Sequence, residues 1–134
     1  MKFFIDTNII ISSALFPNGK TACVFSYILE AHEVIISDYV LKECELVFEM
    51  KFPDKIQALR TFLKKIEYKL FITPKKIDEK KYPKIRDRKD LPILVAAILS
   101  NSDILLTGDK DFSTIAIKKP LIFTPNEYFE FINQ

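Results

Sequence analysis

The sequence predicts an α/β fold, a single doubly wound domain in which helices flank a parallel sheet. Short apolar runs alternate along the chain with longer stretches whose apolar residues recur at helical spacing. Strands that alternate with helices in this way are typical of parallel sheets with helices on both faces. The 134 residues, of which 49% are hydrophobic, are enough for one domain with one core and too few for two ordinary domains.

The first elements follow directly from this alternation. Residues 2–5 form an apolar run that is expected to be a buried strand, and residues 8–15 a short helix. Pro17-Asn18-Gly19 predicts a turn. Residues 21–31 are apolar at helical spacing, and the apolar run at 33–36 predicts the second strand.

Two capped helices and a strand are expected next. Ser37 is placed to cap a helix that runs to about Lys51. Asp54 is placed to cap the following helix, whose apolar stripe ends at Ile66. Residues 69–72 predict the third strand, which a Thr-Pro pair stops.

The last elements begin with a helix at about 90–100 that is apolar nearly all round, which indicates burial on most sides. Its first turn contains a proline, where a missing N–H costs nothing. The fourth strand is expected at 104–106, with a short helix at 112–117 after it. The fifth strand is expected at 121–123, and a last helix starts near Asn126.

Four acidic residues stand where a strand ends or where a helix begins or turns inward. They are Asp6, Glu43, Asp90 and Asp109. Carboxylates at the carboxyl ends of buried strands point into the crevice where open α/β sheets bind ligands. Several carboxylates in one crevice repel each other unless a cation lies between them, and oxygen ligands favour Mg²⁺ or Mn²⁺. The pattern therefore predicts a metal-dependent hydrolase of phosphate esters.

Three of these acids also have a structural interpretation. Glu43 falls on an apolar arc of its helix, where an ionised carboxylate is costly unless it is paired or bound to a cation, but it could also reach water at the boundary. Asp90 could be a helix N-cap. Asp109 could be a turn acid, with Asp111 as the cap of the next helix. The apolar arc on which Glu43 falls is formed by Val40, Cys44, Val47 and Met50.

Charge is distributed unevenly along the chain, although the net charge is only +2. Residues 75–89 carry eight basic and three acidic side chains, a net charge of +5. Residues 90–134 carry three basic and six acidic side chains, a net charge of −3. A basic segment that leads into Asp90 suggests a polyanion held beside an acidic site, and a solvated loop is the equal alternative.

The remaining composition excludes several classes of protein. Cys23 and Cys44 lie on apolar helix patterns and are expected to be buried free thiols. With one histidine, His32, they make no zinc site. No apolar run approaches the roughly 20 residues of a membrane span, and the acid at position 6 comes too early for a signal peptide. A cytoplasmic protein without membrane contact is expected.

Four motifs, in order along nearly the whole chain, resemble those of the PIN-domain nucleases. They are Asp6–Ile10, Ser37 with Val40–Glu43, Asp87–Asp90 leading into Ile93–Ala97, and Thr107–Phe112. Ile122–Phe129 is similar to the family's last strand and helix. The resemblance implies a single PIN-like domain over residues 1–134, with strand order 3-2-1-4-5 and an acidic pocket at the carboxyl edge of the sheet.

The same resemblance implies an endoribonuclease that uses one or two Mg²⁺ or Mn²⁺ ions. Its implied catalytic and metal-binding set is Asp6, Glu43, Asp90 and Asp109. Auxiliary residues are Asn8, Asp87, Thr107 and Asp111, and RNA-binding residues are Lys84, Arg86, Arg88, Lys89 and Lys110. Two departures from the family pattern matter: Asp87 competes with Asp90 for the third motif, and Pro92 can shift the helix start.

Many compact members of the family, the VapC-like group, are toxins of toxin–antitoxin pairs. The resemblance therefore implies a cognate antitoxin, RNA in single-stranded or loop form as substrate, and a homodimer. Tyr82 is a candidate for stacking on an unpaired base. The alternative is a catalytically silent PIN-like module that binds RNA or a protein. A receiver domain or an aspartyl phosphatase is disfavoured, because no acid ends the third strand and Asn8 stands where the phosphatase needs a second acid.

Overall fold

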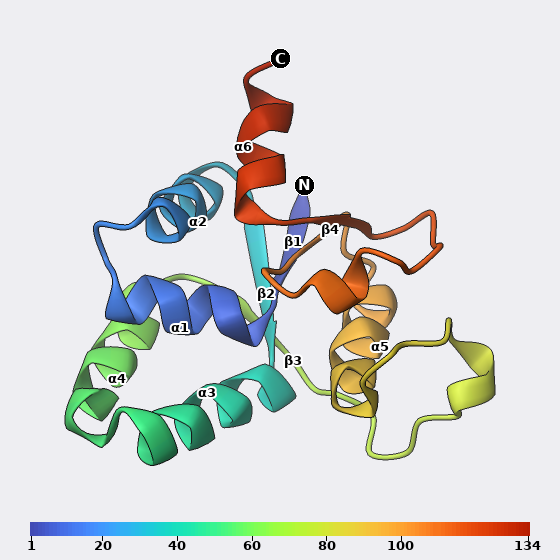
Figure 1. Ribbon diagram of the computed structural model, residues 1–134, viewed down its shortest axis with the longest axis horizontal. Coiled ribbons are helices and arrows are strands. Elements are labelled where there is room, and N and C mark those ends of the chain that lie inside the picture. The colour runs from blue at the N-terminus through green and yellow to red at the C-terminus, as the bar shows by residue number, and fades with distance from the viewer.

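A five-stranded parallel sheet runs through the centre of the computed structural model, which describes residues 1–134 (Figure 1). Its strands are β1 (Lys2–Ile5), β2 (Glu33–Ser37), β3 (Lys69–Phe71), β4 (Ile104–Leu106) and β5 (Leu121–Phe123). The spatial order is β3-β2-β1-β4-β5, and each neighbouring pair is parallel. The predicted α/β class and the strand order 3-2-1-4-5 are confirmed.

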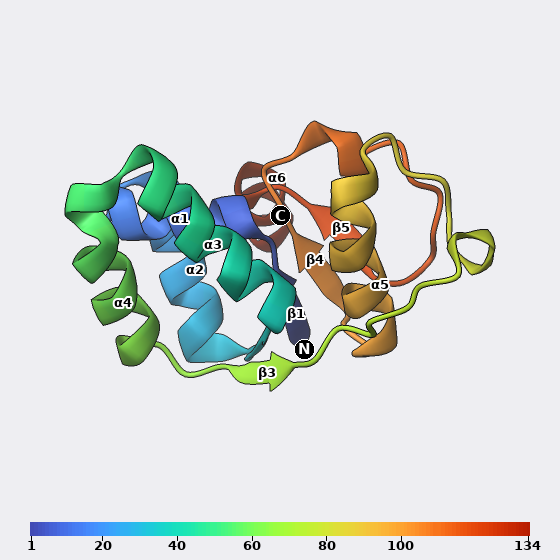
Figure 2. The same ribbon diagram turned by 90° about the horizontal axis from the view of Figure 1, so that it is seen from below.

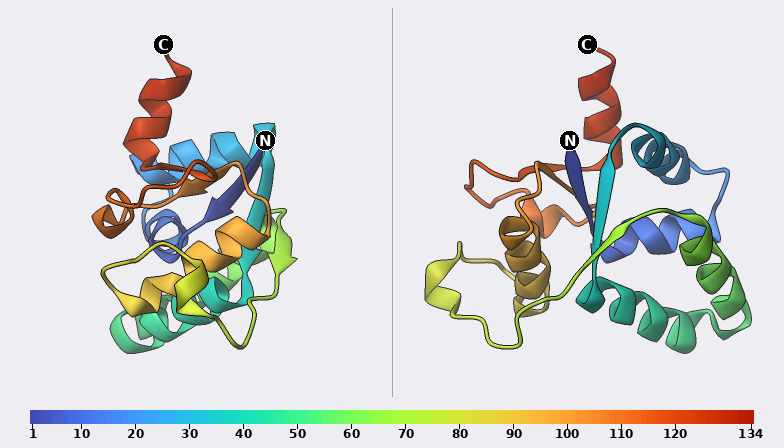
Figure 3. Two further views of the ribbon diagram at one scale, coloured as in Figure 1. Left: turned by 90° about the vertical axis from the view of Figure 1, so that its right-hand side faces the viewer. Right: turned by 180° about the vertical axis from the view of Figure 1, so that it is seen from behind.

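Six α-helices surround the sheet. They are α1 (Thr7–Leu15), α2 (Lys20–Ala31), α3 (Asp38–Lys51), α4 (Ile56–Lys65), α5 (Leu91–Leu99) and α6 (Pro125–Ile132). Helices α1 to α4 gather on one side of the strands and α5 stands on the other, as Figures 1 and 2 both show. The N-terminus and α6 lie at the same end of the sheet, and α6 projects outward from it to the C-terminus (Figure 3). No helix combines the length and the apolar character that a membrane span requires.

The core consists of the strands and the inward faces of the helices. Phe3, Phe4 and Ile5 of β1 are fully buried, because this strand is the middle one of five. Helix α5 is buried from Ile93 to Ala97, as its apolar sequence predicts. The rigid central strands place the residues that follow them, Asp6 and Thr107, at the same edge of the sheet.

Strand register brings these two residues together. Ile5 pairs with Leu106 across the β1–β4 ladder, so the residues that follow them, Asp6 and Thr107, leave the sheet at the same level. The Asp6 amide donates to the Leu106 carbonyl at 3.0 Å and continues the ladder by one bond. Ser37 leaves β2 at this edge as well, and its hydroxyl accepts from the Val40 amide at 3.1 Å, which confirms Ser37 as the cap of α3.

Two expected helix boundaries are wrong. Asp54 does not cap α4: a 3₁₀ turn (η1, Pro53–Lys55) precedes that helix, and no side chain caps it. The helix expected at 112–117 is replaced by a 3₁₀ turn (η4, Lys110–Phe112) and an irregular segment. The β-branched residues of that segment, Thr114, Ile115 and Ile117, lose side-chain freedom in a helix, which favours the irregular conformation.

Two expectations about burial also need correction. Cys44 is buried, but Cys23 is exposed, because α2 turns Val24, Phe25 and Ile28 inward and leaves Cys23 outside that arc. Met50, expected on the apolar arc of α3, is 80% exposed because it lies in the last turn of the helix, beyond the core.

Candidate active site

Asp6 is a carboxylate at the centre of the sheet edge and is only 3% exposed. One of its oxygens, Oδ1, accepts from the Thr7 amide at 2.7 Å and so caps α1. The other, Oδ2, accepts from the Thr107 hydroxyl at 2.6 Å and from the Asn8 amide nitrogen at 3.4 Å. The pKa of Asp6 is raised to about 6, chiefly by burial and to a smaller extent by the charges of Glu43 and Asp109, against the opposing effect of the Thr107 and Thr7 hydrogen bonds.

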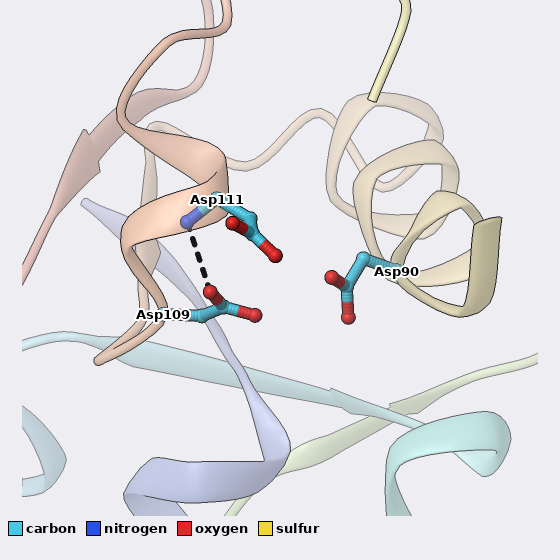
Figure 4. A group of neighbouring side chains, drawn as sticks. All are labelled: Asp90, Asp109 and Asp111. Carbon is cyan, nitrogen blue, oxygen red and sulfur yellow. Dashed lines mark hydrogen bonds between the residues drawn. The ribbon is translucent and has the colours of Figure 1, made fainter. Parts of the chain in front are cut away.

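Three more carboxylates converge beside Asp6. Asp90 lies at the start of α5, and Asp109 and Asp111 lie in the turn that follows β4; one oxygen of each is within 4.8 Å of the others. Figure 4 shows the three side chains pointing toward one another. The Asp111 amide donates to Asp109 Oδ1 at 2.9 Å, which fixes the turn. This acid cluster joins two segments that are about twenty residues apart in the sequence.

Burial and the neighbouring charges disfavour the ionised form of Asp90. Burial raises the pKa of Asp90 to about 7, and the charges of Asp109, Asp6, Asp87 and Glu43 add to the effect in that order. A cation bound beside Asp90 would relieve the repulsion from these neighbouring carboxylates, so the arrangement favours cation binding. The only basic side chain paired with the cluster is Arg86, whose guanidinium lies 3.7 Å from Asp111 and is 85% exposed.

The structure separates the roles of Asp87 and Asp90. Asp87 is exposed, and its Oδ1 accepts from the Lys89 amide at 3.0 Å, so Asp87 caps the 3₁₀ turn η3 (Arg88–Asp90). Asp90 occupies the N-cap position of α5, as one interpretation expected, but its side chain makes no capping hydrogen bond there. Helix α5 begins at Leu91, directly after this turn, with Pro92 among its first two residues. Asp90 is therefore free to face the cluster.

Glu43 approaches the same pocket from α3. Its Oε1 accepts from the Thr7 hydroxyl at 2.6 Å, and the side chain is half-buried. Its charge contributes to the raised pKa values of both Asp6 and Asp90, which places it within electrostatic reach of the other acids. Glu43 is outside the tight cluster of Asp90 and its neighbours.

Asn8 and Thr107 tie the strand ends together. The Gly108 amide donates to Asn8 Oδ1 at 2.9 Å, and the Asp109 amide donates to the Thr107 hydroxyl oxygen at 3.0 Å. A side chain at position 108 would meet Asn8 Oδ1 at 3.3 Å, a tight contact that a glycine avoids. These bonds hold Asp109 in a fixed relation to Asp6.

The predicted RNA-binding residues are all exposed, and most lie on a basic loop, residues 74–89, which projects beyond α5 (Figure 1). They are Lys84, Arg86, Arg88, Lys89 and Lys110. Arg88 pairs with Glu79 at 3.6 Å, and Arg86 with Asp111, whereas Lys110 lies in the turn between Asp109 and Asp111. The Arg86 contact therefore brings the last part of the loop beside the acid cluster.

Two residues in the first turn of α3 anchor both ends of the basic loop. Asp38 Oδ1 accepts from the amide and the hydroxyl of Thr73, each at 2.8 Å, just before the loop begins. The Tyr39 hydroxyl donates to the carbonyl of Lys89, the last residue of the loop, at 2.7 Å. The pKa of Tyr39 is raised by burial and then by the charges of Glu43 and other acids of the pocket. Sequence reasoning missed Tyr39, although its place four residues before Glu43, on one helix face, is a usable signal.

The donors at this site fit a hard divalent cation. All of the converging side chains offer carboxylate oxygens, and neither a histidine nor a thiol takes part, since Cys44 donates only to the Thr7 carbonyl at 3.9 Å. Asp90, Asp109 and Asp111 are the residues close enough to share one ion. Asp6 and Glu43 border this position and have oxygens engaged by hydroxyl groups.

Comparisons with known proteins agree with the observed fold. The family model described as "PIN domain" matches residues 2–111. The chain is similar to a chain in the crystal structure of VapBC2 from Rickettsia felis bound to a DNA fragment from its promoter, with TM-score 0.70 and 18% identity over 92% of this chain and 98% of that one. It is also similar to a domain of a functionally unknown protein from Methanocaldococcus jannaschii, with TM-score 0.58 and 20% identity over 92% and 89%. None of the curated protein sequences matches it significantly.

Proposed function

This chain belongs to the PIN domain family, and we propose that it is a metal-dependent endoribonuclease that hydrolyses phosphodiester bonds in RNA. The observation that carries the proposal is the acid cluster of Asp90, Asp109 and Asp111 beside the buried Asp6. The capping bonds of Asp6 and Asp109 do not account for the convergence of so many carboxylates at the carboxyl edge of a parallel sheet, where burial first and then the neighbouring acid charges raise the pKa of Asp90 to about 7.

We assign a separate role to each acid of the proposed catalytic set and to Asp111. The set is Asp6, Glu43, Asp90 and Asp109. Asp90, Asp109 and Asp111 would hold one or two Mg²⁺ or Mn²⁺ ions, with Asp6 bordering them. A cation held by these residues would supply Lewis acidity that polarises the phosphodiester and lowers the pKa of a water molecule. Glu43, held by the Thr7 hydroxyl, would hold a second ion or orient the attacking water. Asp6, fixed by Thr107, supplies negative charge at the centre of the site.

The basic loop supplies the charge that RNA binding needs. Its lysines and arginines, with Lys110, would neutralise phosphates that flank the cleaved bond. The Asp38 and Tyr39 contacts hold the loop beside the pocket, so the phosphates would be aligned with the acids. Tyr82, half-buried on this loop, remains a candidate for stacking on an unpaired base. Single-stranded or loop RNA is the substrate form that such stacking favours.

We also propose that the protein is the toxin of a toxin–antitoxin pair in the cytoplasm. The support is the likeness of fold to a chain of the VapBC2 structure, together with membership of the PIN family. The proposed partner is a cognate antitoxin, and a homodimer is a further expectation. Aromatic and aliphatic side chains exposed on α2 and α6, Tyr27, Phe129 and Ile132, offer apolar surface for such contacts.

The test is cleavage of a mixed pool of structured RNAs by the purified protein in Mn²⁺, Mg²⁺ or EDTA. Asp6→Asn and Asp109→Asn are expected to abolish cutting and to leave RNA affinity largely intact. Asp54→Asn is the matched control, because Asp54 is an exposed aspartate on η1 with no side-chain role in capping.

Three results would count against the proposal. Cutting that survives both active-site substitutions would point to a contaminant. Cutting that persists in EDTA would contradict a metal-dependent reaction. RNA binding with no cutting under any metal would favour the alternative, a catalytically silent PIN-like module.

A further inference from the structure

A pocket of about 470 Å³ adjoins the acid cluster on the side of β5. Asp109 and Thr107 form the wall that it shares with the proposed active site. Its remaining walls come from the η4 turn, from the irregular segment after it, from β5 and from the start of α6. Its size falls within the usual range for sites that hold small organic molecules.

The η4 turn separates the pocket from the acid cluster. Asp109 and Asp111 point toward Asp90 (Figure 4), whereas Lys110, which stands between them in sequence, lines the pocket. Asp111 is absent from the pocket wall, and Asp109 borders both spaces. A ligand that crosses this turn would have one end at the carboxylates and the other in the pocket, with the Lys110 ammonium close to it.

The lining has the mixed character that a nucleobase requires. Ile115, Ile117 and Ile122 offer apolar surface for the faces of a flat ring. Ser113, Thr124 and Glu127 offer hydroxyl and carboxylate groups that can hydrogen-bond to ring edges. The capping box between Thr124 and Glu127, with bonds of 2.9 and 3.1 Å, fixes the orientation of these two polar residues.

We infer that this pocket binds the nucleobase of a nucleotide next to the phosphodiester that the acid cluster cleaves. The inference rests on the proposed function, which assigns cleavage of the phosphodiester to the acid cluster. It adds that a base of the RNA, bound in this pocket, sets the specificity of cleavage. RNA that is unpaired presents its bases to side pockets of this kind, and the phosphate and base of one nucleotide would span the η4 turn. The pocket therefore reads one base while the basic loop holds the backbone.

The binding test uses the four ribonucleoside 5′-monophosphates and amide chemical shifts of the ¹⁵N-labelled protein. Saturable shifts are expected at Lys110, Ile115 and Ile117, with one base preferred. Ile117→Trp, which fills the pocket, is expected to weaken that binding by about tenfold, the scale on which a hydrophobic pocket discriminates. Ile115→Ala, which enlarges the pocket, should alter the preference among bases and serves if the tryptophan variant misfolds.

The matched control is Ile66→Trp. Ile66 is also half-buried and lines a different pocket of about 440 Å³, between α2 and α4. Nucleotide shifts that are confined to other surfaces, or an equal loss of binding in Ile66→Trp and Ile117→Trp, would overturn the inference.

Cleavage of a random RNA pool separates failure of the pocket from failure of the nuclease. The wild type is expected to favour one base beside the cut, and Ile117→Trp to flatten this preference by about tenfold while cutting continues. Cutting that depends on Asp109 and keeps its base preference in Ile117→Trp would refute the pocket and leave the nuclease. Nucleotide binding at Ile117 with no cutting in any metal would refute the nuclease and leave the pocket as a nucleotide site.

Discussion

Replacing Asp6 by asparagine is expected to stabilise the metal-free protein at pH 8, although the same change should abolish activity. The pKa of Asp6 is about 6 in the folded protein against an ordinary value of 3.8. This difference of about 2 units corresponds to about 3 kcal/mol of folding free energy that the ionised side chain costs. Asn caps a helix as well as Asp, but its NH₂ cannot accept from the Thr107 hydroxyl or from the more distant Asn8 amide nitrogen, a loss of about 1 kcal/mol. The net gain is about 2 kcal/mol.

The dependence on pH follows from the direction of the shift. Because the folded pKa lies above the unfolded one, the folded state keeps a proton that the unfolded state releases between pH 4 and 6. The wild type therefore loses stability as the pH rises through this window, and the cost is complete above about pH 7. The advantage of Asp6→Asn should be present at pH 8 and absent near pH 4.

Thermal unfolding followed by circular dichroism in EDTA measures this difference. A gain of about 2 kcal/mol corresponds to about 6 °C for a chain of this length. Mn²⁺ at about 100 times its dissociation constant should then stabilise the wild type by about 2.7 kcal/mol, so that the wild type becomes more stable than Asp6→Asn. A variant that is less stable than the wild type by the same amount at every pH, with no reversal in Mn²⁺, would refute the reasoning. Asp6 would then act as a structural cap alone.

Three further predictions concern residues around the acids. Thr7→Val removes the hydroxyl that holds Glu43 at 2.6 Å and should lower kcat about tenfold with little change in the KM for RNA; an unchanged kcat would contradict the positioning role. Tyr39→Phe keeps the ring but releases the end of the basic loop, so the KM should rise about fivefold and kcat should change less, as steady-state kinetics would show. Protons compete with metal at Asp90, whose pKa is raised to about 7 chiefly by burial. The Mn²⁺ affinity measured by calorimetry should therefore fall about tenfold per pH unit below 7. An affinity independent of pH would argue against Asp90 as a ligand.

Residues at strand ends were predictable because parallel topology alone determines where they lie. The apolar runs before Asp6 and Asp109 identify β1 and β4, and parallel strands must bring their carboxyl ends to one edge. The helical wheel of α3 placed Glu43 on the inward side, where the structure has it half-buried beside Thr7. These inferences needed only periodicity and the rule that relates parallel strands to helices.

Other features depend on contacts that periodicity does not encode. The close approach of Asp111 to Asp90 arises from the tight η4 turn, which Asp109 fixes through the Asp111 amide, and the sequence suggested an ordinary helix there. The Tyr39 bond to the Lys89 carbonyl spans fifty residues and involves a backbone atom, so no side-chain pattern reveals it. Asp87 caps an additional 3₁₀ turn, η3, that precedes α5, and Asp90 makes no side-chain capping bond to α5.

The most direct test of a metal-dependent cut at this acid cluster is to replace one non-bridging oxygen of the cleaved phosphodiester by sulfur. Mg²⁺ binds oxygen ligands and tolerates sulfur poorly, whereas Mn²⁺ accepts softer ligands. If a cation held by Asp90, Asp109 and Asp111 contacts the phosphate, one of the two sulfur isomers should be cut slowly in Mg²⁺ and recover its rate in Mn²⁺. Equal cutting of both isomers in both metals, or cutting that survives EDTA, would contradict the account.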